Sequence, residues 1–272
     1  MTKLSHRLYA ALLLAALAPA HADSLEPNSL RTRSGQEIGL TVSNYAYQEP
    51  SASVSISAIN YGLEYQKTTL LSDGRFILAG LDYASGTGRY SGSGTLDIPS
   101  YYYNGKIAIG ADWAYRSGII SPYIGLGYRF LNETGGGLTT STGDVMYDRQ
   151  STYLYIPVGF KQRSLTAGGG MLESTFELDY LVSGNQFSGL SVMNNFSYSN
   201  SSDVNNRQTS GYGLNASVMY KRQDGWSLGP YWKYWNISKS DLGTWTYTSG
   251  STSVYEPANT TEEFGFKALY QF

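Results

Sequence analysis

The sequence predicts an all-β protein, a closed antiparallel transmembrane β-barrel of about ten strands. Apolar residues alternate with small or polar residues in many segments, and the gaps between these segments are alternately short and long. The chain also ends in a segment with aromatic residues at every second position. Successive side chains of a strand point to opposite faces, so this alternation indicates strands with one apolar face.

The first 22 residues predict a secretory signal peptide. Lys3 and Arg7 precede an apolar run that ends at residue 18. Residues 20–22 read Ala-His-Ala, an A-x-A cleavage site. This run is too short to cross a bilayer as an anchoring helix. We therefore expect a signal peptide over 1–22 and a single barrel over 23–272.

The composition excludes several functional classes. The chain has no Cys, and its two His residues, His6 and His21, both lie in the predicted signal peptide. The mature chain therefore lacks a thiolate and the side chain that most readily acts as a base near neutral pH. A formal charge of −2 indicates no nucleic-acid partner. We predict no cofactor and no metal site.

The alternation marks ten segments. In the segment 122–130, Ile124, Leu126 and Tyr128 share one face, while Gly125 and Gly127 lie on the other. Tilted strands of about ten residues are long enough to cross a bilayer. Eight or twelve strands remain alternatives, because the stretches 85–104 and 238–261 have room for strand extensions. The apolar faces cover 38–42, 59–65, 77–83, 107–113, 122–130, 154–160, 176–180, 212–220, 228–234 and 264–272.

The opposite faces of these segments are small or polar. A soluble sandwich would bury the apolar faces, whereas a membrane barrel turns them to lipid and turns the polar faces to its lumen. Periodicity alone does not choose between the two, but the signal peptide, the aromatic content of 14% and the chain ending favour the barrel. The predicted network of lumen charges is Glu64, Asp82, Lys106, Asp112, Arg129, Lys161, Glu173, Glu177, Lys233, Glu263 and Lys267.

The gaps indicate which end of the barrel faces outward. Tight turns near 70–74, 116–121, 162–170 and 222–225 alternate with long polar stretches at about 85–104, 131–151, 183–209 and 238–261. Outer-membrane barrels have short periplasmic turns and long extracellular loops. We therefore expect the protein to be integral to a Gram-negative outer membrane, in contact with outer-membrane lipid and lipopolysaccharide.

The last nine residues carry a family resemblance. The chain ends Phe-Gly-Phe-Lys-Ala-Leu-Tyr-Gln-Phe, with Tyr270 and the terminal Phe272 on one face. This ending resembles the carboxy-terminal signature of bacterial outer-membrane β-barrel proteins, and the segment 122–130 is similar to strands of small opacity-type and outer-membrane-protein-X-like barrels. The resemblance implies that the barrel-assembly machinery recognises the last strand. It describes an architecture and implies little about activity.

The absence of His argues against an enzyme. A ten-stranded barrel is similar in size to the omptin proteases, and that resemblance would imply a catalytic His, which the mature chain lacks. We predict no catalytic residues. A Ser–Lys dyad or a raised-pKa carboxylate remains the alternative. Glu173 and Glu177 lie four residues apart on one strand face, but we favour lumen charges that face basic side chains on other strands.

Two non-enzymatic functions remain. The first is recognition or adhesion by the extracellular loops, with a ligand that the sequence does not identify. A barrel that only supports the membrane structurally, without a ligand, belongs to the same class. Tyr gives broad contact at low entropic cost, and Ser, Gly and Asn adapt around it. The second is a narrow channel, although about ten strands leave little open lumen and mixed charges favour cross-strand pairing. The loop candidates for recognition are Tyr101, Tyr102, Tyr103, Phe187, Phe196, Tyr198, Trp245 and Tyr247.

Overall fold

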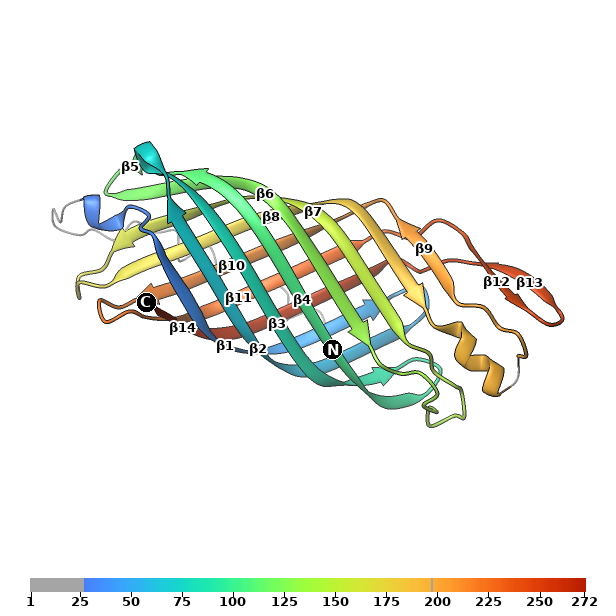
Figure 1. Cartoon of the computed structure of the whole chain (residues 1–272). Helices are drawn as coiled ribbons and strands as arrows, with labels where there is room; N and C mark the ends of the chain where they lie inside the picture. The colour runs from blue at the N-terminus through green and yellow to red at the C-terminus, as the bar shows by residue number, and fades with distance from the viewer. Residues whose placement is uncertain (1–26, 197) are drawn as a thin grey trace.

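The computed structural model describes residues 27–196 and 198–272, so the predicted signal peptide and its cleavage point lie outside the described residues. Within these residues, ten strands close into an antiparallel barrel, which confirms the predicted fold class (Figure 1). The ten strands are β1 (Gly35–Glu49), β2 (Val54–Leu70), β3 (Arg75–Ser91), β4 (Thr95–Ala111), β6 (Gly118–Glu133), β7 (Arg149–Leu165), β8 (Met171–Ser188), β10 (Gly211–Lys221), β11 (Trp226–Ile237) and β14 (Asn259–Gln271).

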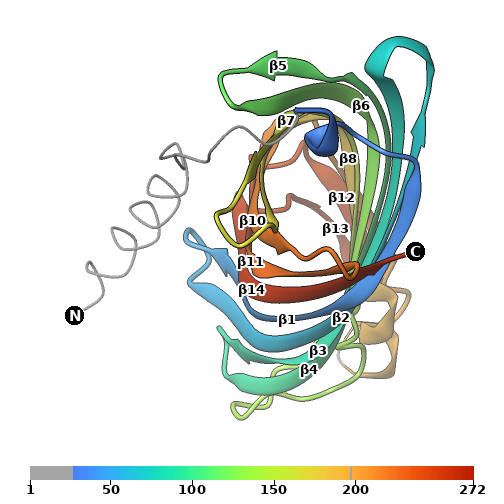
Figure 2. The same cartoon turned by 90° about the vertical axis from the view of Figure 1, so that its left-hand side faces the viewer.

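The barrel is closed by the pairing of its first and last strands. β1 pairs with β14 from Glu37↔Gln271 to Gln48↔Thr260, and β8 pairs directly with β10. Figure 2 shows the ring seen along the barrel. Closure leaves no unpaired strand edge facing lipid. The short elements are η1 (Pro27–Leu30), η2 (Ser72–Gly74), β5 (Trp113–Tyr115), η3 (Leu190–Asn195), β9 (Val204–Gln208), β12 (Gly243–Tyr247) and β13 (Gly250–Val254).

None of the helices in the described part of the chain is long and apolar enough to cross a membrane.

The apolar face of each strand points outward. Leu40 is 66% exposed and Ile107 is 56% exposed, whereas the polar Glu177 is 2% exposed. A soluble sandwich would show the reverse, because burial of apolar surface drives its folding. The structure therefore decides between the two architectures that periodicity left open, and it confirms the predicted facing.

The two ends of the barrel differ. At one end lie the connections 71–74, 112–117, 166–170 and 222–225, together with η1 and the C-terminus (Figure 1). We call this the short-turn end. A positive φ of 91° at Gly225 is a conformation that glycine adopts without strain, and it tightens one of these turns.

The opposite end carries the brief turns 50–53 and 92–94 and three longer connections, 134–148, 189–210 and 238–258, in the described residues. We call this the long-loop end. The predicted extracellular loops at 131–151, 183–209 and 238–261 overlap these connections, but each predicted range also includes strand residues at one or both of its edges.

The prediction of a loop over 85–104 is wrong. β3 and β4 pair without interruption to Ser91↔Thr95, leaving only residues 92–94 as a turn. The outward residues of this extension, such as Thr87, Arg89 and Asp97, are polar. They therefore lack the apolar face that marks a lipid-facing strand, and the sequence pattern stopped where the apolar face stopped.

The hydrophobic core of the barrel lies inside its long-loop half, where three clusters of buried side chains pack within the lumen. Gly213 makes room for one of them, since a Cβ there would lie 2.8 Å from Cε2 of Trp235. Apolar and aromatic packing of this kind leaves little space for water. The clusters are Tyr45, Tyr47, Ile56, Ala58, Tyr90 and Ile98; Tyr153, Tyr155, Leu181, Trp235 and Ile237; and Ala84, Tyr102 and Leu131.

Candidate functional site

Three ion pairs cross the middle of the lumen. They join Lys106 to Glu177 at 2.6 Å, Lys233 to Asp82 at 2.7 Å and Lys267 to Glu64 at 2.9 Å. Each joins strands that are not neighbours in the barrel. The six side chains were all predicted to face the lumen, and their opposite charges meet across it. This geometry differs from a ring of like charges that would select ions.

Glu177 is engaged on several sides. Its carboxylate binds Lys106 and also accepts hydrogen bonds from Tyr123 Oη at 2.8 Å and from Asn215 Nδ2 at 3.2 Å. Glu173 contacts different cations, at 2.7 Å to Arg163 and 3.1 Å to Lys221. Each carboxylate is therefore neutralised by its own basic partners.

Two predicted lumen charges face inward without joining an ion pair among the described residues. Glu263 accepts hydrogen bonds from Ser43 Oγ at 2.8 Å and from the hydroxyls of Tyr102 and Tyr231, each at 2.6 Å. The guanidinium of Arg129 lies over the ring of Tyr102 at 4.8 Å from its centroid. Hydroxyl donors and aromatic faces thus stabilise charge where the hydrophobic core begins.

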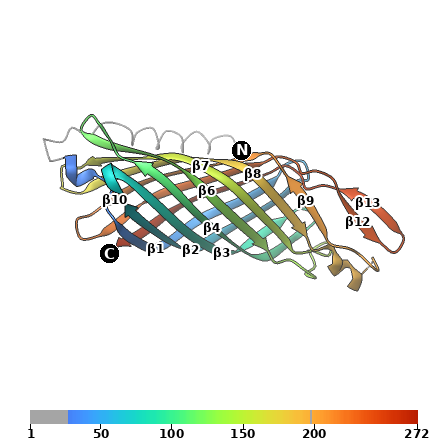
Figure 3. The same cartoon turned by 45° about the horizontal axis from the view of Figure 1, so that its top comes forward.

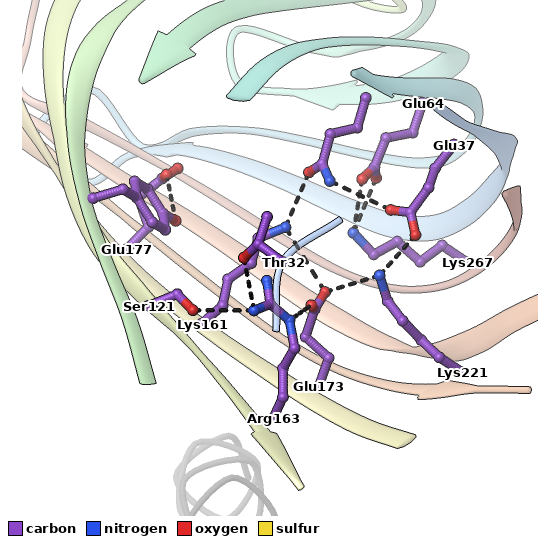
Figure 4. Close-up of polar contacts among 12 residues, drawn as sticks. Thr32, Glu37, Glu64, Ser121, Lys161, Arg163, Glu173, Glu177, Lys221 and Lys267 are labelled. Carbon is purple, nitrogen blue, oxygen red and sulfur yellow. Dashed lines mark hydrogen bonds and ion pairs between the residues drawn. The ribbon is translucent and has the colours of Figure 1, made fainter. Parts of the chain in front are cut away.

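A closed ring of polar contacts spans the lumen nearer the short-turn end (Figure 4). Lys221 contacts Glu37 at 2.7 Å and Glu173 at 3.1 Å. Lys161 lies 3.7 Å from Glu173 and donates to Gln66 Oε1 at 3.3 Å, and Gln66 Nε2 donates to Glu37 at 3.3 Å. We call Glu37, Gln66, Lys161, Glu173 and Lys221 the polar ring.

The N-terminal segment is anchored beside the polar ring. The backbone N–H and hydroxyl of Thr32 donate to Asp112 at 2.6 and 2.7 Å. Arg163 donates to Thr32 Oγ1 and Ser121 Oγ, both at 3.0 Å (Figure 4). It also lies 3.5 Å from Asp112. The predicted lumen residue Asp112 therefore tethers the segment before β1 to the barrel wall.

Sequence reasoning missed three charged members of this region, Glu37, Arg163 and Lys221. The predicted strands were bounded by their apolar faces, and all three lie at strand ends just beyond those bounds. The same period of two places all three on the inward face. Extending each segment by a few residues toward the short-turn end finds them.

Two cavities lie on either side of the polar ring. The inner cavity, of about 120 Å³, reaches the crossing ion pairs and includes Glu64, Lys106 and Glu177 in its lining. The outer cavity, of about 860 Å³, lies at the short-turn end and includes Arg31 and Arg33. All five residues of the polar ring line both cavities, so the ring separates them.

A second charged cluster lies in the long-loop half. Arg149 contacts Glu49 at 2.5 Å and Glu133 at 3.7 Å, and it also binds Glu256. Glu256 lies between β13 and β14, outside the membrane-spanning strands. Burial raises the pKa of Glu256 to about 7, against the pull of Arg149 and with added repulsion from Glu49 and Glu133. Within the described residues, no group of three or more potential ligands is arranged to hold a metal ion.

The placement of Tyr101, Tyr102 and Tyr103 in a loop is wrong, because they lie within β4. Tyr102 points inward and is 2% exposed. Tyr101 and Tyr103 point outward and contact the ring of Phe130 at centroid distances of 6.1 and 5.0 Å. Such outward aromatics are typical of the interface between lipid and water. Phe187 likewise lies in a strand, β8.

Three other recognition candidates meet in one cluster. The ring of Trp245 lies 5.1 Å from that of Tyr198 and 4.9 Å from that of Tyr247. Trp245 Nε1 donates to Ser201 Oγ at 2.7 Å, and Ser202 N donates to Thr246 O at 2.9 Å. We call η3, residues 198–203 and the β12–β13 hairpin the loop lobe. It extends beyond the barrel at the long-loop end (Figure 3).

Exposed apolar side chains flank the loop lobe. Phe196, Leu242 and Tyr255, each next to one of its segments, are 49%, 67% and 47% exposed. Lys239 Nζ lies 3.8 Å from the centroid of the Tyr255 ring. Exposed apolar residues near ordered polar loops are common at binding surfaces.

Comparison with known proteins extends only to the fold. No protein family with a defined sequence profile matches the chain, and no curated protein sequence matches it. The outer-membrane protease OmpT from Escherichia coli aligns over 93% of this chain and 99% of its own length, with a TM-score of 0.54 and 11% identity. The beta domain of the Bordetella autotransporter Brka aligns over 88% and 100%, with a TM-score of 0.42 and 13% identity. The likeness to OmpT shows that this chain has the fold of an outer-membrane β-barrel.

Proposed function

We propose that this protein is a non-enzymatic, integral outer-membrane barrel whose long-loop end serves surface recognition or adhesion. In this proposal the short-turn end faces the periplasm and the long-loop end faces outward, as in outer-membrane barrels generally. The observation that carries the proposal is the filled lumen. Aromatic clusters occupy its long-loop half, and ion pairs and the polar ring cross the rest.

The loop lobe is the surface that we propose for recognition. Its backbone is ordered by hydrogen bonds between residues 199–202 and the β12–β13 hairpin, while Phe196, Leu242 and Tyr255 are exposed near it. A preorganised loop surface loses less entropy on binding than a flexible one. If the loop lobe binds no ligand, the same proposal reduces to structural support of the membrane by the barrel.

The proposal extends to the partners of the barrel. Tyr270 and Phe272 lie at the end of the chain and are 41% and 61% exposed, so their rings are available to lipid and to the barrel-assembly machinery. The exposed apolar band would contact outer-membrane lipid, and the polar extension of β3 and β4 would contact lipopolysaccharide.

Conductance in planar bilayers tests the filled lumen. We expect the folded protein to give no discrete current steps, because in this proposal the aromatic clusters block a continuous water path. Stable steps would contradict the proposal and favour the alternative, a narrow channel.

Arrays of glycans and of extracellular proteins test recognition. We expect the wild-type protein to bind at least one array member, and the triple variant Phe196→Ser/Leu242→Ser/Tyr255→Ser to lose that signal. The matched control is Leu40→Ser, which changes an exposed apolar residue on the lipid-facing wall. Equal signals from the wild type and the triple variant would refute recognition by this surface.

A further inference from the structure

The outer cavity at the short-turn end carries a surplus of positive charge. Among the described residues, its lining includes six basic and three acidic side chains, a formal charge of +3, in a chain whose net charge is −2. Asp112 behind Arg163 reduces the surplus to +2 when it is included. A concave surface with one sign of charge and low-dielectric walls concentrates ligands of the opposite sign. The basic residues are Arg31, Arg33, Lys161, Arg163, Lys221 and Arg222.

Lys161 is the loosely held cation on the floor of this cavity. Its Nζ lies 3.3 Å from Gln66 Oε1 and 3.7 Å from Glu173, whereas Lys221 lies 2.7 Å from Glu37. Glu173 already accepts a shorter bond from Arg163, at 2.7 Å. An ammonium group has three donors, so Lys161 keeps donor capacity for another acceptor while its side chain is 9% exposed.

Two arginines supply the charge at the rim. Arg31 and Arg33 are exposed, and neither forms an ion pair with a carboxylate whose side chain the structure describes. Arg222, in contrast, is neutralised by Asp224 at 2.7 Å. Guanidinium groups bind phosphate oxygens in a bidentate manner, which favours phosphate over a monovalent anion.

We propose that this cavity is a binding site for a small phosphate-bearing molecule. Arg31 and Arg33 contact its phosphate groups at the rim, and Lys161 donates to it from the floor. The cavity volume of about 860 Å³ lies in the range of small-molecule sites. The site lies at the opposite end of the barrel from the loop lobe, so it does not depend on the proposed recognition function.

Calorimetric titration with inorganic pyrophosphate tests this site, using the folded protein in zwitterionic micelles at low, fixed ionic strength. We expect saturable binding near one pyrophosphate per barrel. Lys161→Gln removes the floor contact, and Arg31→Gln/Arg33→Gln removes the rim contacts. Each variant should weaken binding by about tenfold or more, as expected for the loss of charge-assisted hydrogen bonds.

The matched control is Arg89→Gln/Lys239→Gln, which removes two exposed positive charges at the long-loop end. We expect it to bind pyrophosphate as the wild type does. Absence of saturable binding to the wild type overturns the proposal, and so does an equal loss in the control, which would indicate a general charge effect. The rim variant changes only exposed side chains, so it keeps the test valid if Lys161→Gln disturbs folding; circular dichroism checks each variant.

Discussion

Arg129 illustrates how single residues hold charge inside this barrel. It is 2% exposed, and its guanidinium lies between the rings of Tyr102 and Trp235, at 4.8 and 5.6 Å from their centroids. The ring faces carry partial negative charge, so they stabilise a cation without a carboxylate. A charge placed in this way does not require water in the lumen to stabilise it.

Glu256 gives the long-loop half a dependence on pH. It shares Arg149 with Glu49 and Glu133, and Tyr47 Oη donates to Glu49 at 2.5 Å. Because the pKa of Glu256 is raised to about 7, the folded state keeps a proton that the unfolded chain loses near pH 4.5. Stability from this group is therefore fully present below pH 4.5 and is lost as the pH rises to about 7.

We expect Glu256→Gln to flatten this dependence. The wild-type free energy of unfolding should fall between pH 5 and pH 8 by on the order of 1–3 kcal/mol more than that of the variant. Urea unfolding in lipid vesicles at pH 5 and pH 8 measures this difference in the free energy of unfolding. Glu262→Gln is the control, since Glu262 faces outward and accepts from Trp232 Nε1 at 3.0 Å. A fall of equal size in wild type and Glu256→Gln would contradict the assignment.

At the scale of elements, the sequence predicts each barrel strand from its lipid-facing part. The alternation located β4 through Ile107 and Ile109, which face lipid. It missed the part of β4 before Gly105, which begins with outward polar residues such as Asp97. Strand residues that face lipid must be apolar, whereas those that face water need not be. The apolar alternation therefore ends at the membrane surface, although the hydrogen bonding between strands continues beyond it.

The loop elements were not predictable for a different reason. η3, β12 and β13 are held by contacts between distant segments, such as Thr248 N donating to Ser199 O at 2.8 Å. Short polar segments show neither the helical nor the strand period of apolar residues, so no local sequence signal marks them. The same limit explains the cluster at Arg149, whose partners Glu49, Glu133 and Glu256 come from separate connections or strand ends.

Trp245 stabilises the loop lobe. Its ring packs on Tyr198 and Tyr247, and its indole N–H donates to Ser201. We expect Trp245→Ala to loosen residues 189–203 and to speed their cleavage by added protease about tenfold, because the lobe opens more often. Barrel unfolding in urea should stay unchanged. Leu242→Ala is the control, since Leu242 is 67% exposed in the same connection. Unchanged cleavage in Trp245→Ala would show that this cluster does not order the lobe.

At the scale of the whole molecule, three layers of side-chain contacts follow one another along the lumen. The polar ring lies nearest the short-turn end, the crossing ion pairs follow, and the aromatic clusters fill the long-loop half. In the proposed closed barrel each layer excludes water by itself, so removing one layer leaves the others in place. A ligand can then bind in the outer cavity from the short-turn end without opening a pore.

The triple variant Lys161→Ala/Glu173→Ala/Lys221→Ala removes the polar ring and leaves the aromatic clusters in place. We expect it to remain silent in planar bilayers, because Tyr153 and Trp235 still stack at a centroid distance of 5.7 Å. The chain has no Cys, so Thr175→Cys, in the lining of the inner cavity, gives a single label site. A thiol reagent added in solution should label this site faster in the triple variant than in the protein with the intact ring. Faster labelling would show that the ring has opened. Current steps together with fast labelling would show that the ring, rather than the aromatic half, closes the lumen.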